Sequence, residues 1–182
     1  SGNCDTHRMH VIKFAKSSGI SCLLFDYRLA PENKFPAAVE DCVIVYDWLL
    51  KNGYEPSNIV IGGESAGGTL TFSMLLALKD SEKTLPKAAF SISPLTDSNC
   101  KAKSFNYNAK KDIATLNSWN VWTKLYIGDS DVNNPLISPI YGDLEGLPHL
   151  FICVGTHEVH YDDAVNFAEK AEKAGVSVKL SV

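Results

Sequence analysis

The sequence lacks the features that mark several large classes of protein. No apolar run reaches the roughly 18 residues that a membrane-spanning helix needs, and the polar first residues do not form a signal peptide. The net charge is −4, from 17 Lys and Arg against 21 Asp and Glu, and neither sign is concentrated in one stretch. We therefore expect no membrane span and no binding to nucleic acid or to an anionic membrane surface.

Cysteine is also scarce. The five cysteines stand at positions 4, 22, 42, 100 and 153. Their number is odd and no two have C-x-x-C spacing, so we expect neither a disulfide framework nor a zinc site. Cys22 and Cys153 fall in apolar runs, where a free cysteine behaves as a small core residue. This pattern favours a reducing compartment, and we expect the protein to be cytoplasmic.

What the 182 residues do contain is an alternation of helical and strand patterns. Helices are predicted at 4–18, 36–50, 66–79, 113–127 and 162–174, and strands at 22–25, 59–61, 88–92, 150–154 and 176–182. Such an order predicts one α/β domain, with a mainly parallel sheet and helices on both faces. Ligands of these sheets bind where strands end, so we expect the chemistry after Phe25, Ile61, Ile92 and Val154.

Residues 98–146 depart from this alternation. They are richer in Asn and Lys, and the predicted helix at 113–127 carries Leu116, Trp119, Trp122 and Tyr126 near one face. Aromatic residues at helical spacing are usually core, so a covering helix is one interpretation. The other is an irregular, partly helical excursion that borders a substrate pocket.

A nucleophile motif follows the strand predicted at 59–61. Gly63 to Gly67 reads GESAG, which matches G-x-S-x-G, and it opens the next predicted helix. The motif alone is a weak signal, but a strand, a sharp turn and a helix are the setting that it requires. That setting predicts Ser65 as a nucleophile, with its hydroxyl clear of the sheet and an oxyanion forming at a helix N-terminus. A plain tight turn or a phosphate loop is the alternative.

Several blocks resemble the hormone-sensitive-lipase-like branch of the α/β-hydrolase esterases, the bacterial family IV type. They are 26–32 (DYRLAPE), 35–38 (FPAA), 63–68 (GESAGG), Ser93-Pro94 with Asp97, Trp122 with Tyr126, and Ser138-Pro139. The resemblance runs nearly end to end. It implies an α/β-hydrolase fold over residues 1–182 and hydrolysis of a small-molecule carboxylic ester, with a preference for short acyl chains. It also implies a Ser, acid and His triad, an acyl-enzyme intermediate, and no metal or cofactor.

The acid of the triad should follow a later strand than the serine. The family usually has an Asp where Glu158 aligns, and Glu can orient and stabilise an imidazolium with one more methylene. We therefore predict Glu158. Asp162, four residues on, remains an alternative, although it also suits the N-cap of the next helix. Asp97 is a further alternative, because some α/β-hydrolases place the acid after that earlier strand.

The resemblance leaves two parts of the machinery unaccounted for. The triad base should follow the last strand, whereas all five histidines precede it, and His157 and His160 are better explained as loop residues. The family also has a His-Gly-Gly-Gly loop, just before the region that Ser1 to Asn3 resembles, which supplies most of the oxyanion hole. We therefore expect a partial domain, truncated at both ends, with the base outside this chain and the backbone N–H of Ala66 as the remaining oxyanion donor.

Two other functions are compatible with this fold. Gibberellin receptors resemble this branch, keep the pocket and lack the triad histidine, so a non-catalytic receptor for a small molecule is the main alternative. A partner-binding scaffold has no supporting feature in the sequence. Since Ser65 and Glu158 are both present, the residues favour hydrolysis.

Overall fold

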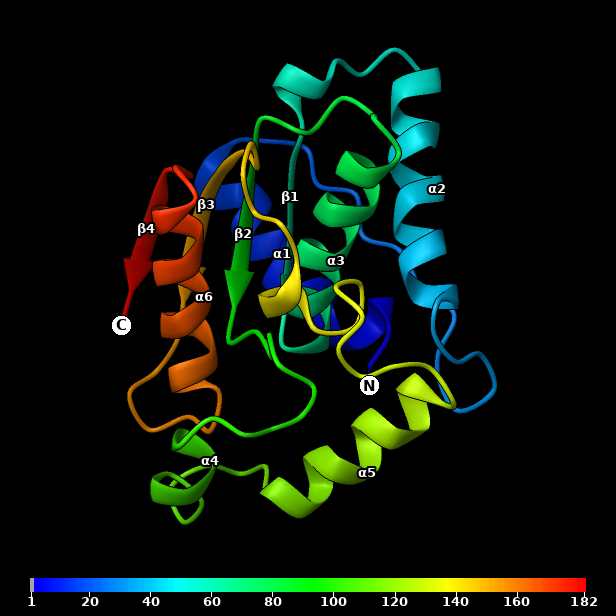
Figure 1. The fold of residues 1–182 in the computed structure, drawn as a ribbon. Coiled ribbons are helices and arrows are strands. Elements are labelled where there is room, and N and C mark those ends of the chain that lie inside the picture. The colour runs from blue at the N-terminus through cyan, green and yellow to red at the C-terminus, as the bar shows by residue number, and fades with distance from the viewer. Residues whose placement is uncertain (1) are drawn as a thin grey trace.

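A computed structural model describes residues 2–182, so the expectation at Ser1 lies outside the described residues. Figure 1 shows a four-stranded sheet in which strands and helices alternate along the chain. The strands are β1 (Val60–Glu64), β2 (Ala88–Ile92), β3 (His149–Cys153) and β4 (Val178–Ser181). The helices are α1 (Cys4–Ser18), α2 (Ala37–Lys51), α3 (Ala66–Asp80), α4 (Ser104–Tyr107), α5 (Leu116–Ile127) and α6 (Tyr161–Lys173), with 3₁₀ turns η1 (Pro56–Asn58) and η2 (Pro139–Tyr141).

The sheet has the parallel order β1-β2-β3-β4. A parallel sheet built from helical crossovers brings the carboxyl ends of its strands to one edge. The residues that follow β1, β2 and β3 therefore lie along the same edge, as the sequence predicted. In Figure 1, α4 and α5 lie beyond this edge, so the segment 98–146 passes over the ends of the strands.

The two faces of the sheet are covered unequally. Side chains that point toward α3 and α6 are buried, among them Leu150 and Ile152 at 0% exposure. On this face Phe72 of α3 stacks on Phe167 of α6, with ring centroids 4.1 Å apart. The opposite face meets α1, which has no buried residue and reaches the sheet through Phe14. The hydrophobic core therefore lies on the α3 and α6 side.

Helix boundaries follow local capping chemistry. Helix α1 begins with a capping box, in which Asn3 Oδ1 accepts from the Thr6 amide at 3.0 Å and Thr6 Oγ1 accepts from the Asn3 amide at 3.0 Å. It ends at Gly19 in the left-handed conformation (φ 69°). Helix α3 is apolar on most sides and ten of its residues are buried, which confirms the expectation for an all-round apolar helix.

The strand predicted at 22–25 is not formed. This stretch has no strand assignment, and Cys22 and Leu23 are exposed, so the expectation that Cys22 is a core residue is wrong. An apolar run becomes a strand only when a neighbour pairs with its backbone. Within residues 2–182 no strand pairs with 22–25, and β1 pairs with β2 alone.

The segment 98–146 is more irregular than the prediction of one helix at 113–127. The helix α5 begins only at Leu116, where the Thr115 side chain accepts from the Ser118 amide at 3.3 Å. The short helix α4 was not predicted. Along α5, Trp119 is buried, whereas Trp122 is half exposed. The aromatic stripe is therefore only partly core.

Candidate active site

Ser65 sits at a strained turn between β1 and α3. Its backbone has φ 55° and ψ −118°, outside the regions that a residue with a side chain normally adopts. The turn is held by the Ser65 amide, which donates to the carbonyl of Ile92 at 2.8 Å. The serine predicted as a nucleophile therefore occupies the strand, turn and helix geometry of a nucleophile elbow.

Glycine at position 63 makes this turn possible. A Cβ added to Gly63 would lie 2.3 Å from the carbonyl carbon and oxygen of Gly67, closer than any side chain can pack. A Cβ added to Gly67 meets no described atom within 4 Å. Of the two motif glycines, only Gly63 must be glycine, because the backbone of Gly67 lies too close to it for a Cβ atom.

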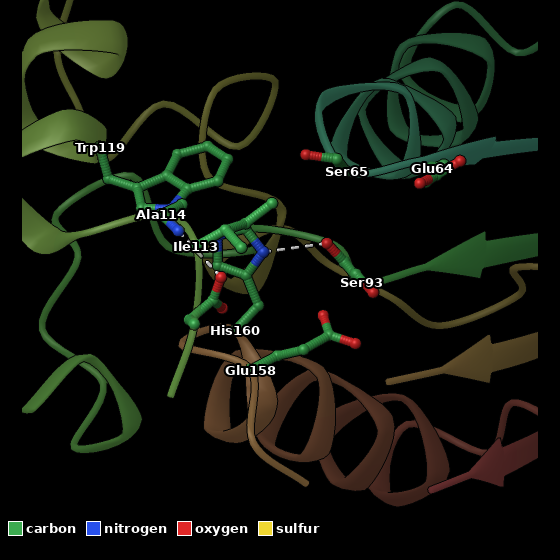
Figure 2. A pocket seen from close by; sticks show the side chains of 9 residues that line it. Glu64, Ser65, Ser93, Ile113, Ala114, Trp119, Glu158 and His160 are labelled. Atoms are coloured by element: carbon green, nitrogen blue, oxygen red, sulfur yellow. Dashed lines mark hydrogen bonds between the residues drawn. The ribbon is translucent and has the colours of Figure 1, made fainter. Parts of the chain in front are cut away.

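Ser65 opens onto a cavity of about 340 Å³, which we call the Ser65 pocket. Figure 2 shows the Ser65 hydroxyl pointing across the pocket toward the side of Trp119, with Ser93, His160 and Glu158 below it in this view, whereas the Glu64 carboxylate points away. Its lining residues are Glu64, Ser65, Ser93, Asp112, Ile113, Ala114, Trp119, Glu158 and His160. They come from the ends of β1, β2 and β3 and from the segment 98–146, so distant parts of the sequence meet here.

Glu158 lies in the loop after β3 and is held by its own turn. The Gly155 amide donates to Glu158 Oε1 at 2.7 Å, and the Glu158 amide donates to the Gly155 carbonyl at 3.1 Å. A Cβ on residue 155 would lie 2.9 Å from Glu158 Oε1, so glycine there leaves room for the carboxylate. The structure thus brings Glu158 and Ser65 to the same pocket.

His160 also lines the Ser65 pocket, but it is bonded to the backbone. Its Nδ1 lies 3.0 Å from the carbonyl oxygen of Ser93. Because a carbonyl only accepts, Nδ1 carries the proton and Nε2 is the unprotonated nitrogen of the neutral ring. Burial lowers the pKa of His160, which favours this neutral form. The ring packs against Trp119, with centroids 4.3 Å apart.

The other histidines are farther from this chemistry. His157 is exposed, His7 and His10 lie on α1, and His149 pairs with Ser177 Oγ at 2.8 Å. Within residues 2–182, no histidine forms a hydrogen bond with Ser65 or with the carboxylate of Glu158.

The two alternative acids are engaged elsewhere. Asp162 accepts from the Ser104 amide at 2.8 Å and from the Tyr107 hydroxyl at 2.7 Å. It does not cap α6, whose N-cap is His160, so the expectation of an N-cap at Asp162 is wrong. Asp97 accepts from the amide and side chain of Asn99 and from the Tyr141 hydroxyl at 3.1 Å. Neither carboxylate lines the Ser65 pocket.

Sequence reasoning missed the pocket residues contributed by the segment 98–146 other than Trp119. Asp112 is the clearest case, because its two carboxylate oxygens accept from the Val159 amide at 2.7 Å and from the Ala114 amide at 3.0 Å. No motif marks it. The only signal was the general expectation that this segment borders a pocket.

Neither a cluster of metal ligands nor a membrane-spanning helix is found among residues 2–182. No three His, Cys, Asp or Glu side chains among residues 2–182 gather as metal ligands would. The described helices include none with the length and apolarity needed to cross a bilayer.

The comparison with known families covers the whole chain. Residues 1–182 match the model of a protein family whose description is alpha/beta hydrolase fold. An acetyl-hydrolase of Streptomyces hygroscopicus is 38% identical over 97% of this chain and 60% of its own length. An esterase of Acinetobacter venetianus is 34% identical over 100% of this chain and 60% of its own length. The chain therefore spans about 60% of the length of these curated relatives.

Solved structures give the same result. An esterase from the bacterial hormone-sensitive lipase family superposes with a TM-score of 0.98 at 42% identity, covering 100% of this chain and 61% of that one. EstE5, in a crystal soaked with p-nitrophenyl butyrate, superposes with a TM-score of 0.97 at 40% identity, with the same coverage. The relatives found by sequence and those found by structure are thus of the same kind, namely esterases and an acetyl-hydrolase.

Proposed function

Because this chain belongs to the family with the alpha/beta hydrolase fold, we propose that it carries the nucleophile and the acid of a serine carboxylesterase. Ser65 is the nucleophile, Glu158 is the triad acid, and the base is a histidine outside residues 1–182. The proposal extends to the whole protein, because this chain spans only about 60% of the length of its relatives. Short-chain acyl esters are the proposed substrates.

One observation carries this proposal. Ser65 has the strained backbone of a nucleophile elbow and faces a pocket that Glu158 also lines. Backbone strain of this kind persists only where the surrounding structure enforces it, and it clusters at active sites. A plain tight turn would not need its serine aimed into a shared pocket.

The proposed reaction is acyl transfer in two steps. The base takes the proton from Ser65 Oγ as the oxygen attacks the ester carbonyl, and the tetrahedral intermediate collapses when the base returns that proton to the leaving alcohol. Water, deprotonated by the same base, then attacks the acyl-enzyme, which releases the carboxylic acid product and restores Ser65. Glu158 orients the base and stabilises its positive charge.

The oxyanion of each intermediate needs preorganised donors. Ala66 is the first residue of α3, so its N–H has no acceptor within the helix. It therefore stands free at a helix N-terminus beside Ser65, where partial positive charge favours an anion. We assign Ala66 as one oxyanion donor and expect further donors from outside residues 1–182.

The pocket walls favour a small apolar acyl group. Ile113, Ala114 and the large ring of Trp119 form one side of the Ser65 pocket. The part of the pocket that residues 2–182 form has a volume of about 340 Å³, within the roughly 300–1,000 Å³ of small-molecule sites. The apolar side chains on this side suit a small acyl group.

The first prediction tests the nucleophile in the full-length protein. Ser65→Ala should lower kcat for p-nitrophenyl acetate by about 10⁴–10⁶, because the attacking oxygen is gone. Wild-type protein should be labelled stoichiometrically at Ser65 by a fluorophosphonate, and the variant should not be. Ser81→Ala, at the exposed end of α3, is the matched control.

A folded Ser65→Ala protein that still turns over the ester would contradict the proposal. A wild-type protein that binds a small ester or carboxylic acid, leaves it intact and resists the fluorophosphonate would favour the receptor instead.

A further inference from the structure

The loop that carries Glu158 cannot form all of its backbone hydrogen bonds within itself. We call residues 155–160, between β3 and α6, the acid turn. Its internal bonds join Gly155 to Glu158, and they leave the carbonyls of Thr156, Glu158 and Val159 and the amide of Val159 without a partner inside the turn. Just beyond the turn, the Tyr161 amide donates to the Glu158 carbonyl at 3.2 Å. Val159 is 1% exposed, so water does not reach its backbone readily. Buried backbone groups need hydrogen-bond partners, which must come from another part of the chain.

Asn108 supplies two of these partners. Its side-chain amide Nδ2 donates to the carbonyl oxygens of Thr156 at 3.0 Å and of Glu158 at 2.8 Å. Asn108 Oδ1 accepts from Lys111 Nζ at 3.2 Å, and an ammonium only donates, so this contact fixes which way the amide is turned. Asn108 is 0% exposed, and both of its amide hydrogens donate to carbonyls of the acid turn.

Two neighbours of Asn108 complete the support. Ser104 Oγ donates to the Val159 carbonyl at 2.6 Å, and Asp112 Oδ2 accepts from the Val159 amide at 2.7 Å. Ser104 is also 0% exposed. The stretch 104–112 therefore acts as a template on which the acid turn is folded, although the two are about 50 residues apart in sequence.

We propose that Asn108 is a positioning residue for the acid. It holds the backbone of Glu158 itself, so that the carboxylate above it faces the Ser65 pocket. Asn108 is not among the residues that line that pocket, and so it acts through Glu158 and not on the substrate. This assignment rests on the function proposed above, because it needs Glu158 to be the triad acid.

The test uses Asn108→Leu in the full-length protein, since leucine keeps the branched shape and removes both donors. We expect kcat to fall about 10²-fold, the cost of a misplacement on the order of 1 Å, while KM changes little. The acid limb of the kcat/KM profile should move to lower pH, because a displaced carboxylate stabilises the imidazolium less. A loss of folded protein alone would lower the number of fluorophosphonate-reactive sites and leave this limb in place.

Asn106→Leu is the matched control. Asn106 lies two residues away at the same short helix, is exposed, and makes no side-chain hydrogen bond to another described residue. It should keep the wild-type kcat and pH profile. If Asn108→Leu does not fold, Ser104→Ala is the milder variant, because it removes one hydroxyl, and it should move the same limb in the same direction by less.

A double-mutant cycle separates action through Glu158 from general damage. In a Glu158→Gln background, Asn108→Leu should cost almost nothing further, since residues that act as a unit are not additive. A full second loss in that background overturns the assignment, as does an Asn108→Leu protein that behaves like the control. A wild-type protein that neither hydrolyses the ester nor reacts with the fluorophosphonate overturns the proposed function and the assignment together.

Discussion

At the scale of single residues, Glu158 tests whether a carboxylate one methylene longer than Asp can serve as the triad acid. Glu158→Gln keeps the size and the bond from the Gly155 amide but removes the charge. We expect kcat to fall by about 10⁴, as for triad acids elsewhere and no more than for the serine change. Steady-state kinetics on p-nitrophenyl acetate measure this loss.

Asp162→Asn and Asp97→Asn are the companion variants. Both side chains are held by hydrogen bonds away from the Ser65 pocket, so each variant should stay within about tenfold of wild type. A crippled Asp162→Asn or Asp97→Asn beside an active Glu158→Gln would show that the acid has been assigned to the wrong residue.

Asp163 should make stability depend on pH. It is 3% exposed and its Oδ2 has no partner among the described residues, and burial raises the pKa of this carboxyl well above its usual range. The folded protein therefore holds the proton more tightly than the unfolded chain does. The free energy of unfolding should fall as pH rises above about 3.9, the ordinary Asp value, and continue to fall up to the raised pKa.

Asp163→Asn removes that titration. Urea unfolding of the full-length protein at several values between pH 4 and pH 8 should show a flatter decline for this variant than for wild type. Asp80→Asn, at an exposed position on α3, should keep the wild-type slope. Equal slopes for all three proteins would mean that Asp163 is not protonated in the folded state.

The residues that could be predicted from sequence are those with local signals. Ser65 stands in a motif between a strand and a helix, and Glu158 follows the right strand, so both were placed at the pocket. Asn108 and Asp112 could not be found this way. Their partners are backbone groups about 50 residues away, and any residue type can offer a backbone carbonyl or amide.

At the scale of elements, the nucleophile elbow predicts opposite effects for its two glycines. Gly63→Ala places a methyl group against the backbone of residue 67 and should destabilise the protein by about 1–3 kcal/mol or more. Gly67→Ala meets open space within the first turn of α3 and should be neutral or stabilising by up to about 1 kcal/mol. Thermal unfolding of both variants checks this, and similar melting temperatures would contradict it.

Elements with their own periodicity and end signals were predicted well. The helix at 4–18 and the strand at 88–92 coincide with α1 and β2, and the other strands of the sheet differ by a few residues at their ends. The failures have physical reasons. Residues 22–25 need a partner strand, and the short helix α4 is fixed by bonds from Ser104 and Tyr107 to Asp162 rather than by its own sequence pattern.

At the scale of the whole molecule, residues 1–182 alone should show no esterase activity above background. Without a base, the Ser65 hydroxyl keeps its proton and is a poor nucleophile. Each missing oxyanion donor costs roughly 2.7–4 kcal/mol of transition-state stabilisation. Within the described residues β1 is paired on one side only and Val60 is 52% exposed, so this piece should also aggregate readily.

The measurement is fluorophosphonate labelling of the expressed segment 1–182. It should label slowly or not at all, whereas the full-length protein should label fast. Stoichiometric labelling of Ser65 that disappears in His157→Ala or His160→Ala would contradict the prediction and place the base inside this chain.

The template formed by residues 104–112 has a consequence for exchanging parts between relatives. An engineer who wants a different substrate range would graft the 98–146 excursion, since it supplies much of the pocket wall. In doing so, the graft would also replace the side chains that fold the acid turn. Wall and acid turn therefore form one transferable module, and chimeras should keep their catalytic rate only when 155–160 is moved together with 98–146.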